Sequence, residues 1–110
     1  MLSDIAGFKA GPDGETDFDF VICNGLLMGR FHLSNQEFDI FARNTISKLY
    51  SMCKVGVIFN LKSTYVDFFS EDIFYKNPLE CLSFVFDNLT KKVILDHSYL
   101  DYEYFVTLLR

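Results

Sequence analysis

Hydrophobic residues recur at three- and four-residue steps through one long segment of the chain, which predicts an amphipathic helix over about residues 35–53. Ser34 and Glu37 stand at the spacing of a capping box, in which each side chain binds the backbone N–H of the other residue. Ile40 lies off the hydrophobic face. The positions that share this face are Phe38, Phe41, Ala42, Thr45, Ile46, Leu49, Met52 and Cys53. We therefore expect the helix to cover one face of a sheet.

The segment before this helix alternates hydrophobic and polar residues, as a half-buried strand does. Residues 16–23 carry a first run, and residues 26–33 carry a second run after Asn24 and Gly25. An Asn-Gly pair is favoured in the two-residue turn of a β-hairpin, because both central residues need a positive φ. The sequence therefore predicts a hairpin here, with Gly29 marking a bulge in its return strand.

The segment after the helix predicts further strands. Residues 55–61 alternate regularly, and a second strand is expected at residues 64–69, after a tight turn at Lys62 and Ser63. A short helical turn is expected at residues 70–72, where the sequence is Ser-Glu-Asp.

Two later segments fit both a helix and a strand. Asn77 and Pro78 resemble the start of a helix, with a capping side chain and a proline in the first turn, yet residues 82–86 also alternate. A hairpin between residues 78–89 and a strand at 92–96 is the favoured interpretation. Residues 99–109 are ambiguous in the same way, and there a C-terminal helix is favoured.

These elements predict a single α+β domain over residues 1–110, in the order β-β-α-β-β-β-β-α. Strands that are joined by hairpins form an antiparallel sheet, which the central helix would cover in a second layer. Residues 1–15 are expected to be a loose lead-in, because three glycines and Pro12 interrupt any period there.

The amino-acid composition favours one soluble domain whose cysteine thiols are reduced. Half of the 110 residues are hydrophobic, enough to fill a core without disulfides. Cys23, Cys53 and Cys81 are odd in number and widely spaced. The first residues lack the basic and long apolar regions typical of a signal peptide, and no apolar run approaches the roughly 20 residues that span a membrane. We therefore expect a cytoplasmic protein with reduced thiols and no membrane contact.

The net charge is −5, and it is unevenly distributed along the chain. An acidic protein is disfavoured near nucleic-acid phosphate and favoured near a basic protein. The acidity is concentrated in residues 1–29 and 63–110, whereas the segment between them is basic on balance. If these two acidic segments meet in the sheet, they form one acidic surface.

A row of carboxylates at every second position is the most unusual local feature. Its members are Asp13, Glu15, Asp17 and Asp19, and in an extended chain they project to one side. A calcium-binding EF-hand loop beginning at Asp13 would have Phe18 where glycine is needed and Asn24 where a bidentate glutamate is needed. The sequence therefore predicts no calcium site there.

Tyrosines near carboxylates combine rigid contact area with negative charge, which suits a Lys- and Arg-rich partner. The alternative is a solvated surface without a partner. The candidate partner-binding residues are Asp13, Glu15, Asp17, Asp19, Asp67, Glu71, Asp72, Tyr99, Asp101, Tyr102 and Glu103.

No motif for catalysis, a cofactor or a metal stands out. His32 and His97 lack further ligands at metal-binding spacing. The glycines form neither G-x-G-x-x-G nor a phosphate-binding loop. We therefore expect neither an enzyme nor a cofactor or metal site, although an active site assembled only by folding is left open.

The acidic residues 13–20 and the acidic, Tyr-rich C-terminal segment resemble small bacterial immunity proteins, including those paired with contact-dependent inhibition toxins. This resemblance in overall character implies a protein that neutralises a secreted nuclease-type toxin by tight stoichiometric binding, with acidic residues steering association. The alternatives are a small-molecule-binding α+β module or accessory enzyme subunit, and a mimic of nucleic acid, for which a net charge of −5 is small.

Overall fold

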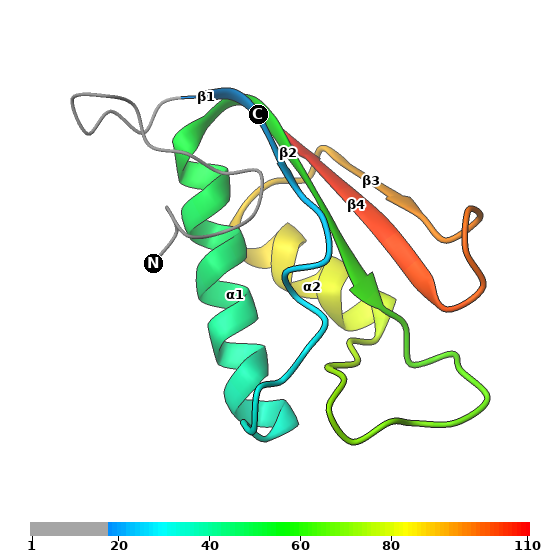
Figure 1. Cartoon of the computed structure of the whole chain (residues 1–110). Helices are drawn as coiled ribbons and strands as arrows, with labels where there is room; N and C mark the ends of the chain where they lie inside the picture. Colours follow the sequence, from blue (N-terminus) through cyan, green and yellow to red (C-terminus); the bar gives the residue numbers. More distant parts are fainter. Residues whose placement is uncertain (1–17) are drawn as a thin grey trace.

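The computed structural model describes residues 18–110, which form two helices and one four-stranded sheet. The elements are β1 (Phe18–Cys23), α1 (Asn35–Met52), β2 (Cys53–Lys62), α2 (Pro78–Asn88), β3 (Val93–Asp96) and β4 (Glu103–Leu109) (Figure 1). The α+β class is confirmed, whereas the predicted order of elements is wrong. The lead-in predicted for residues 1–15 lies outside the described residues.

The sheet is mixed, which corrects the prediction of an antiparallel sheet built from hairpins. Its order is β1-β2-β4-β3, with β1 parallel to β2 and with β4 antiparallel to both of its neighbours. A parallel pair needs a crossover connection, and α1 supplies it between β1 and β2. Strand β4 comes last in the described chain but lies inside the sheet.

Helix α1 confirms the prediction for residues 35–53 to within one residue, since Cys53 already begins β2. The capping box is complete: the Glu37 N–H donates to Ser34 Oγ at 3.0 Å, and the Ser34 N–H donates to Glu37 Oε1 at 2.9 Å. Phe41 departs from the predicted face, because it is 43 % exposed. The buried positions of α1 are Phe38, Ala42, Thr45, Ile46, Leu49 and Met52.

The hairpin predicted around Gly25 does not form, because residues 26–33 are a loop rather than a return strand. Gly25 has the positive φ expected of it, at +84°, but its N–H donates to Oδ1 of Asn60 on β2 at 2.8 Å. Gly29 makes only an isolated bridge to Ile73. The turn is therefore held by β2, and β1 pairs in parallel with that same strand.

The strand predicted at residues 64–69 and the helical turn predicted at 70–72 are also wrong, since residues 63–77 form one long loop. Two backbone hydrogen bonds tie this loop to the loop that follows β1. They join the Arg30 N–H to the Asp72 oxygen at 2.8 Å and the Phe74 N–H to the Met28 oxygen at 2.6 Å. The loop is thus paired with another loop, and it meets the sheet at an isolated bridge between Tyr75 and Lys62 at the end of β2.

Residues 78–88 form α2, so the favoured hairpin is wrong there and the helical alternative is correct. The Asn77 side chain caps the helix by accepting a backbone hydrogen bond at 2.8 Å, and Pro78 occupies the first turn. Cys81 and Val85, four residues apart, face the core. The alternation of residues 82–86 is therefore a coincidence of composition within one helical turn and a half.

The C-terminal segment forms strand β4 rather than the predicted helix. Its burial alternates, with Tyr104, Val106 and Leu108 fully buried and the residues between them partly exposed. It pairs with β2 on one edge and with β3, the strand expected at 92–96, on the other. Pairing between distant segments decides between two patterns that the local sequence leaves balanced.

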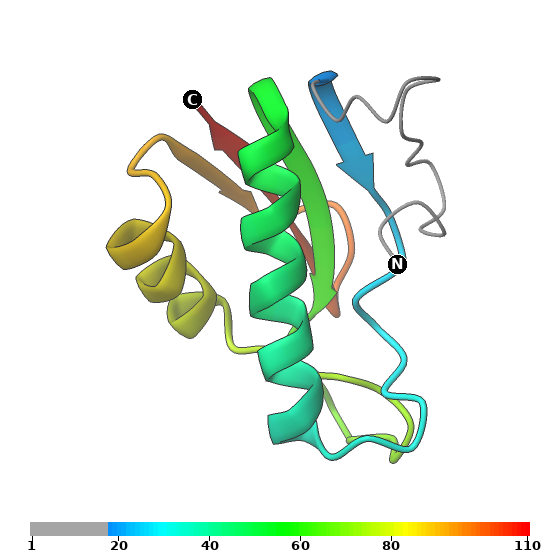
Figure 2. The ribbon, with the colours of Figure 1, turned by 90° about the vertical axis from the view of Figure 1, so that its left-hand side faces the viewer.

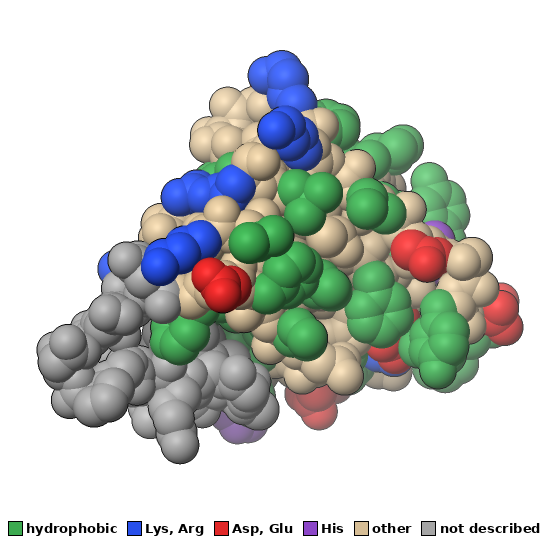
Figure 3. Space-filling model, turned by 90° about the horizontal axis from the view of Figure 1, so that it is seen from above, with side chains coloured by type: hydrophobic (Ala, Val, Ile, Leu, Met, Phe, Trp, Pro, Cys, Tyr) green, Lys and Arg blue, Asp and Glu red, His purple; other side chains and the backbone are tan. Residues whose placement is uncertain are grey.

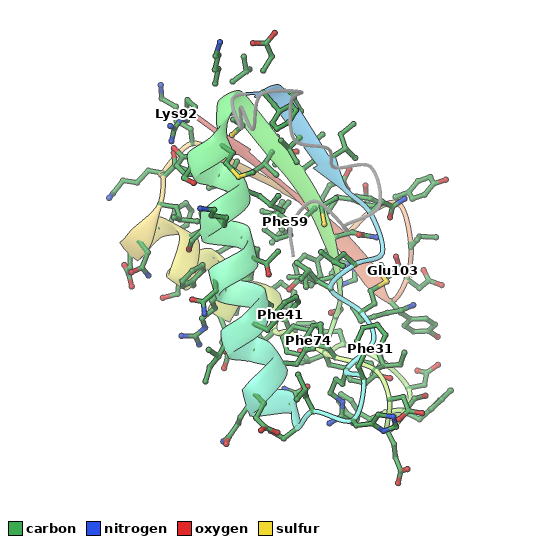
Figure 4. The ribbon with its side chains drawn as sticks, turned by 60° about the vertical axis from the view of Figure 1, so that its left-hand side comes forward. Phe31, Phe41, Phe59, Phe74, Lys92 and Glu103 are labelled. Carbon is green, nitrogen blue, oxygen red and sulfur yellow. The ribbon has the colours of Figure 1, made fainter. Side chains whose placement is uncertain are left out.

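Both helices lie on the same face of the sheet (Figure 2). The hydrophobic core lies between these two layers, where Phe59 of β2 and Phe74 of loop 63–77 are buried (Figure 4). Neither helix covers the opposite face of the sheet. No helix within residues 18–110 is long and apolar enough to cross a membrane.

Candidate functional site

The carboxyl ends of β1 and β2 define one edge of the sheet, and three connections meet there. They are the loop 24–34 after β1, the loop 63–77 after β2, and the turn 97–102 that leads into β4. In open α/β sheets, ligands bind at the carboxyl ends of parallel strands, because the loops there leave a crevice. A ligand site is therefore expected at this edge of the sheet.

A cleft of about 220 Å³ opens at this edge, between loop 63–77 and the start of β4. Three of the side chains that form it are aromatic, two are aliphatic and three are polar or charged. The lining residues are Lys62, Val66, Asp67, Phe68, Ser70, Ile73, Tyr75 and Tyr102. A concave apolar surface with a few polar groups is the usual character of a small-molecule site.

One wall of the cleft is fixed by a bond between its two ends. The Tyr102 hydroxyl donates to Oδ2 of Asp67 at 2.7 Å. This bond to a carboxylate raises the pKa of Tyr102 above its ordinary value, because the protonated hydroxyl is the form that donates. The bond joins segments 35 residues apart in the sequence, so loop 63–77 is held against the entry of β4.

The base of the cleft carries a compensated charge. Lys62 Nζ lies 2.8 Å from Oε2 of Glu103, and the Asn60 side-chain amide donates to Oε1 of the same residue at 3.3 Å. Asn60 is only 2 % exposed, and its oxygen accepts the Gly25 N–H. Both Glu103 oxygens are therefore bonded, and the charge of Lys62 is neutralised.

Tyr75 orders the middle of loop 63–77. Its hydroxyl accepts a hydrogen bond from the Ser70 N–H at 2.8 Å, and its ring meets the Phe69 ring edge-on with centroids 4.8 Å apart. The loop is thus folded around one of the rings that line the cleft. Phe68 and Phe69 nevertheless remain 74 % and 63 % exposed, so the loop presents aromatic surface to solvent.

A larger polar groove of about 640 Å³ lies beside the start of α1, but its charged groups already bind one another. Asp39 accepts contacts from Lys76 at 2.9 Å and from Arg43 at 2.8 Å, and Glu80 lies 3.6 Å from Lys76. A ligand would have to displace these ion pairs. The smaller cleft, with its apolar lining, is therefore the stronger candidate.

The described candidate partner-binding residues lie toward two ends of the sheet. Asp67 and Tyr102 line the cleft. Glu103 does not line it but forms an ion pair with Lys62, which does. Asp19 lies toward the other end of the sheet, near the start of β1. The surrounding loop and turn carry the exposed residues Glu71, Asp72, Tyr99 and Asp101. Asp13, Glu15 and Asp17 lie outside the described residues.

Sequence patterns did not predict the other lining residues of the cleft. The predicted strand at 64–69 includes Phe68 and the predicted turn includes Lys62, whereas Ile73 and Tyr75 belong to no predicted element. Their convergence depends on loop 63–77 folding back toward β4. The one sequence feature that points to this region is Asn60, a polar residue between the apolar Phe59 and Leu61 of β2. A buried amide needs hydrogen-bond partners, so polar groups are expected around it.

The thiols offer no reactive group at this edge. Cys23, Cys53 and Cys81 are unpaired and buried, and burial raises the pKa of Cys23 and of Cys81 to about 11. Such thiols are protonated at neutral pH and are poor nucleophiles. Within residues 18–110, no group of three His, Cys, Asp or Glu side chains is placed to hold a metal ion.

No protein-family profile matches the sequence, and no curated protein matches it. Two solved structures of magnesium protoporphyrin IX methyltransferase from Synechocystis PCC 6803 share its fold. The form with bound SAM matches with a TM-score of 0.56, and the form with bound SAH with 0.59, both at 17 % identity. The match covers 100 % of this chain but only 44 % and 49 % of the two methyltransferase chains.

This likeness corrects the resemblance to immunity proteins that was inferred from acidity and tyrosine content. The described residues share the fold of part of a SAM-dependent methyltransferase, with a parallel βαβ unit. The immunity resemblance depended on composition alone, and composition does not determine a fold. At 17 % identity, the similarity concerns the fold and assigns no activity.

Proposed function

We propose that this chain is a small-molecule-binding module, and that its ligand is a small organic cation with an apolar body. The ligand would occupy the cleft between loop 63–77 and Tyr102. The observation that carries the proposal is the lining of this cleft, which combines three aromatic rings with a carboxylate at the carboxyl end of β2.

The aromatic side chains favour a cation. Phe68, Tyr75 and Tyr102 contribute rings to one cleft. The face of an aromatic ring carries negative electrostatic potential, so an ammonium group within about 6 Å of a ring centroid gains about 0.5–2 kcal/mol. The same rings offer apolar area to the body of the ligand.

The charges around the cleft favour a cation as well. Asp67 lines the cleft, and the positive charge of Lys62 is neutralised by Glu103 at 2.8 Å. The same loop and turn carry further exposed carboxylates, namely Glu71, Asp72 and Asp101. A concave site edged by charges of one sign concentrates ligands of the opposite sign.

The size of the cleft limits the ligand. A volume of about 220 Å³ is smaller than the roughly 300–1,000 Å³ of sites for drug-sized molecules. S-adenosylmethionine and tetrapyrroles are larger than such a cleft accommodates. We therefore propose neither of them as the ligand of this chain, although the proteins of similar fold act on or bind such molecules.

The test is a titration followed by ¹⁵N–¹H correlation spectra with three probes of similar size. They are 2-phenylethylamine, which is cationic, 2-phenylethanol, which is neutral, and phenylacetate, which is anionic. The amine is expected to shift the amides of Ser70 and Ile73 and to bind about tenfold more tightly than the alcohol. Phenylacetate is expected to bind more weakly than either of them.

Asp67→Asn provides the matched variant, because it keeps the shape and the acceptor for Tyr102 but removes the charge. It is expected to weaken amine binding about fivefold and to leave alcohol binding unchanged. Asp87→Asn, at an exposed position on α2 away from the cleft, is the control and should change neither. Equal binding of all three probes, or shifts confined to other segments, would contradict the proposal.

A further inference from the structure

The sheet face that neither helix covers is rich in hydrophobic side chains. Phe20, Ile22 and Ile94 are 41 %, 59 % and 57 % exposed there. Side chains alternate along strands, so the residues between the buried positions of β2 and β4 point to this same face. They include Ile58, Phe105, Thr107 and Leu109, which are partly exposed. We call this set of side chains the open face.

The pairing register brings these side chains into continuous rows. Ile22 pairs with Ile58, which pairs with Thr107, and Thr107 pairs with Ile94 on the far edge. One row thus crosses all four strands. In a second row, Phe20 is opposite Gly56, which pairs with Leu109. An exposed apolar patch that spans a sheet commonly marks an interaction site.

The two ends of the open face carry opposite charge. Lys54, Lys91 and Lys92 lie at the end where β2 and β3 begin, with Asp19 of β1 also near that end. The other end carries Asp96, Asp101 and Glu103, and Lys62 pairs with the last of these. Lys92 and Glu103 lie at opposite ends of the sheet (Figure 4).

The space-filling view agrees with this distribution. Seen from above, hydrophobic side chains occupy the middle of the surface, with Lys and Arg side chains mainly to the left and at the top and Asp and Glu side chains mainly to the right (Figure 3). A surface that is apolar in the middle, positive at one end and negative at the other is complementary to itself when one copy is reversed.

We propose that the open face binds a second copy of this chain, sheet against sheet, about a two-fold axis that lies in the interface and crosses the strands at right angles. This axis reverses the strand direction, so the Lys92 end of β3 in one copy lies over the Asp96 end of β3 in the other. The same patch is used by both copies, as in most homodimers. The two sheets then pack face to face as in a β-sandwich.

The dimensions of the open face predict a weak dimer. Four strands about 4.8 Å apart and about six residues long make a face of about 20 by 20 Å. Such a face buries less than the roughly 1,200 Å² of a standard stable interface. We therefore expect a dissociation constant of about 10 μM to 1 mM, as in transient associations.

Sedimentation equilibrium over a concentration range of about 5 μM to 2 mM tests the proposal. The wild-type chain is expected to pass from monomer to dimer in this range. Ile22→Lys and Ile94→Lys place charge in the middle of the interface and should each raise the dissociation constant about tenfold or more. Ile40→Lys and Leu79→Lys are the controls, because those residues are 62 % and 67 % exposed on the helices and should change it less than about threefold.

A second pair of variants tests the orientation. Lys92→Glu is expected to weaken the dimer about fivefold or more, because it opposes Asp96 of the other copy. Asp96→Asn should weaken it by about threefold, while its side-chain oxygen still accepts the Ser98 N–H that the aspartate now accepts at 2.8 Å. Circular dichroism of each variant confirms that it is folded.

Three outcomes would overturn the proposal. A chain that stays monomeric up to about 2 mM would show that the open face does not bind a second copy. A dimer that resists Ile22→Lys and Ile94→Lys but is lost in the control variants would place the interface on the helices. A dimer weakened by the isoleucine variants but insensitive to Lys92→Glu would exclude the reversed orientation.

Discussion

Lys76 Nζ lies 2.9 Å from Oδ1 of Asp39, and only 11 % of the lysine side chain and 17 % of the aspartate side chain are exposed. The pair joins the end of loop 63–77 to the second turn of α1. Asp39 has a further partner in Arg43, at 2.8 Å, whereas within residues 18–110 the ion-pair partner of Lys76 besides Asp39 is Glu80, at 3.6 Å. Lys76 therefore depends on Asp39 for its close ion pair, whereas Asp39 keeps Arg43 when Lys76 is removed.

This inequality predicts that Asp39→Asn is more damaging than Lys76→Met. Removing the carboxylate leaves the lysine charge nearly buried without its close partner, at an expected loss of about 3 kcal/mol of unfolding free energy. Lys76→Met leaves Asp39 paired with Arg43, and the expected loss is about 1 kcal/mol. Urea unfolding followed by circular dichroism measures both values. Equal losses in the two variants would show that Arg43 does not compensate for the missing lysine.

Capping by Asn77 predicts a modest and specific loss of stability. Its Oδ1 accepts the Leu79 N–H at 2.8 Å, which satisfies one free donor in the first turn of α2. Asn77→Ala is expected to lower the unfolding free energy by about 1 kcal/mol, and Asn77→Gly by only a few tenths, because glycine also suits the cap position. Thermal unfolding compares the two variants. The reverse order would mean that the asparagine acts through another contact.

The close approach of β2 and β4 predicts that Gly56 cannot be replaced. A Cβ at this position would lie 2.5 Å from the Leu108 carbonyl oxygen and 3.0 Å from the Leu109 side chain. Backbone has to move to relieve the first contact, so Gly56→Ala is expected to cost about 2–3 kcal/mol or more.

Gly29→Ala is the matched control for Gly56→Ala. Its added Cβ would meet nothing closer than the Phe31 ring at 3.7 Å, an ordinary van der Waals contact. The control is expected to change stability by less than about 0.5 kcal/mol, or to raise it slightly by restricting the unfolded chain. Urea unfolding of both variants tests the difference, and a stable Gly56→Ala protein would contradict the described register of β2 and β4.

Buried thiols predict a loss of stability at alkaline pH. Burial raises the pKa of Cys23 and of Cys81 from 9.0 to about 11, and burial also raises the pKa of Tyr104. Between pH 9 and 11 the unfolded chain therefore releases thiol protons that the folded chain retains. Unfolding is then favoured as the pH rises, so the unfolding free energy falls through this window and is flat below it for these groups.

Urea midpoints measured from pH 7 to pH 10 test this dependence. The double variant Cys23→Ala, Cys81→Ala is expected to be less stable at pH 7, because it leaves cavities, but to lose stability less steeply above pH 9. An unchanged slope would show that the thiols are not the groups responsible.

Local sequence was sufficient to predict the elements whose stabilising contacts are themselves local. The Ser34–Glu37 capping box and the hydrophobic spacing of α1 are complete within about one helix, and both are present in the structure. Asn77 and Pro78 gave an equally local signal for α2, but the alternation at 82–86 outweighed it. The capping pair was the better guide, because Asn77 accepts the Leu79 N–H and Pro78 occupies the first turn of α2.

The sheet could not be predicted in the same way. Whether Gly25 turns into a hairpin depends on Asn60, which accepts its N–H from 35 residues away. Strand β4 was ambiguous because its pairing with β2 and β3 is what selects a strand. The cleft has the same origin, since Asp67 and Tyr102 meet only after the sheet has formed.

The position of β4 between β2 and β3 has a consequence for how the protein is made. Strands β1 and β2 can pair as soon as α1 has formed, but β3 touches the sheet only through β4. A chain emerging from the ribosome therefore holds the edge of β2 and all of β3 without partners until residues 103–109 have emerged. During that interval the exposed strand edges can pair with other chains. Completion of the sheet depends on contacts between segments that are distant in the sequence, and such contacts form slowly.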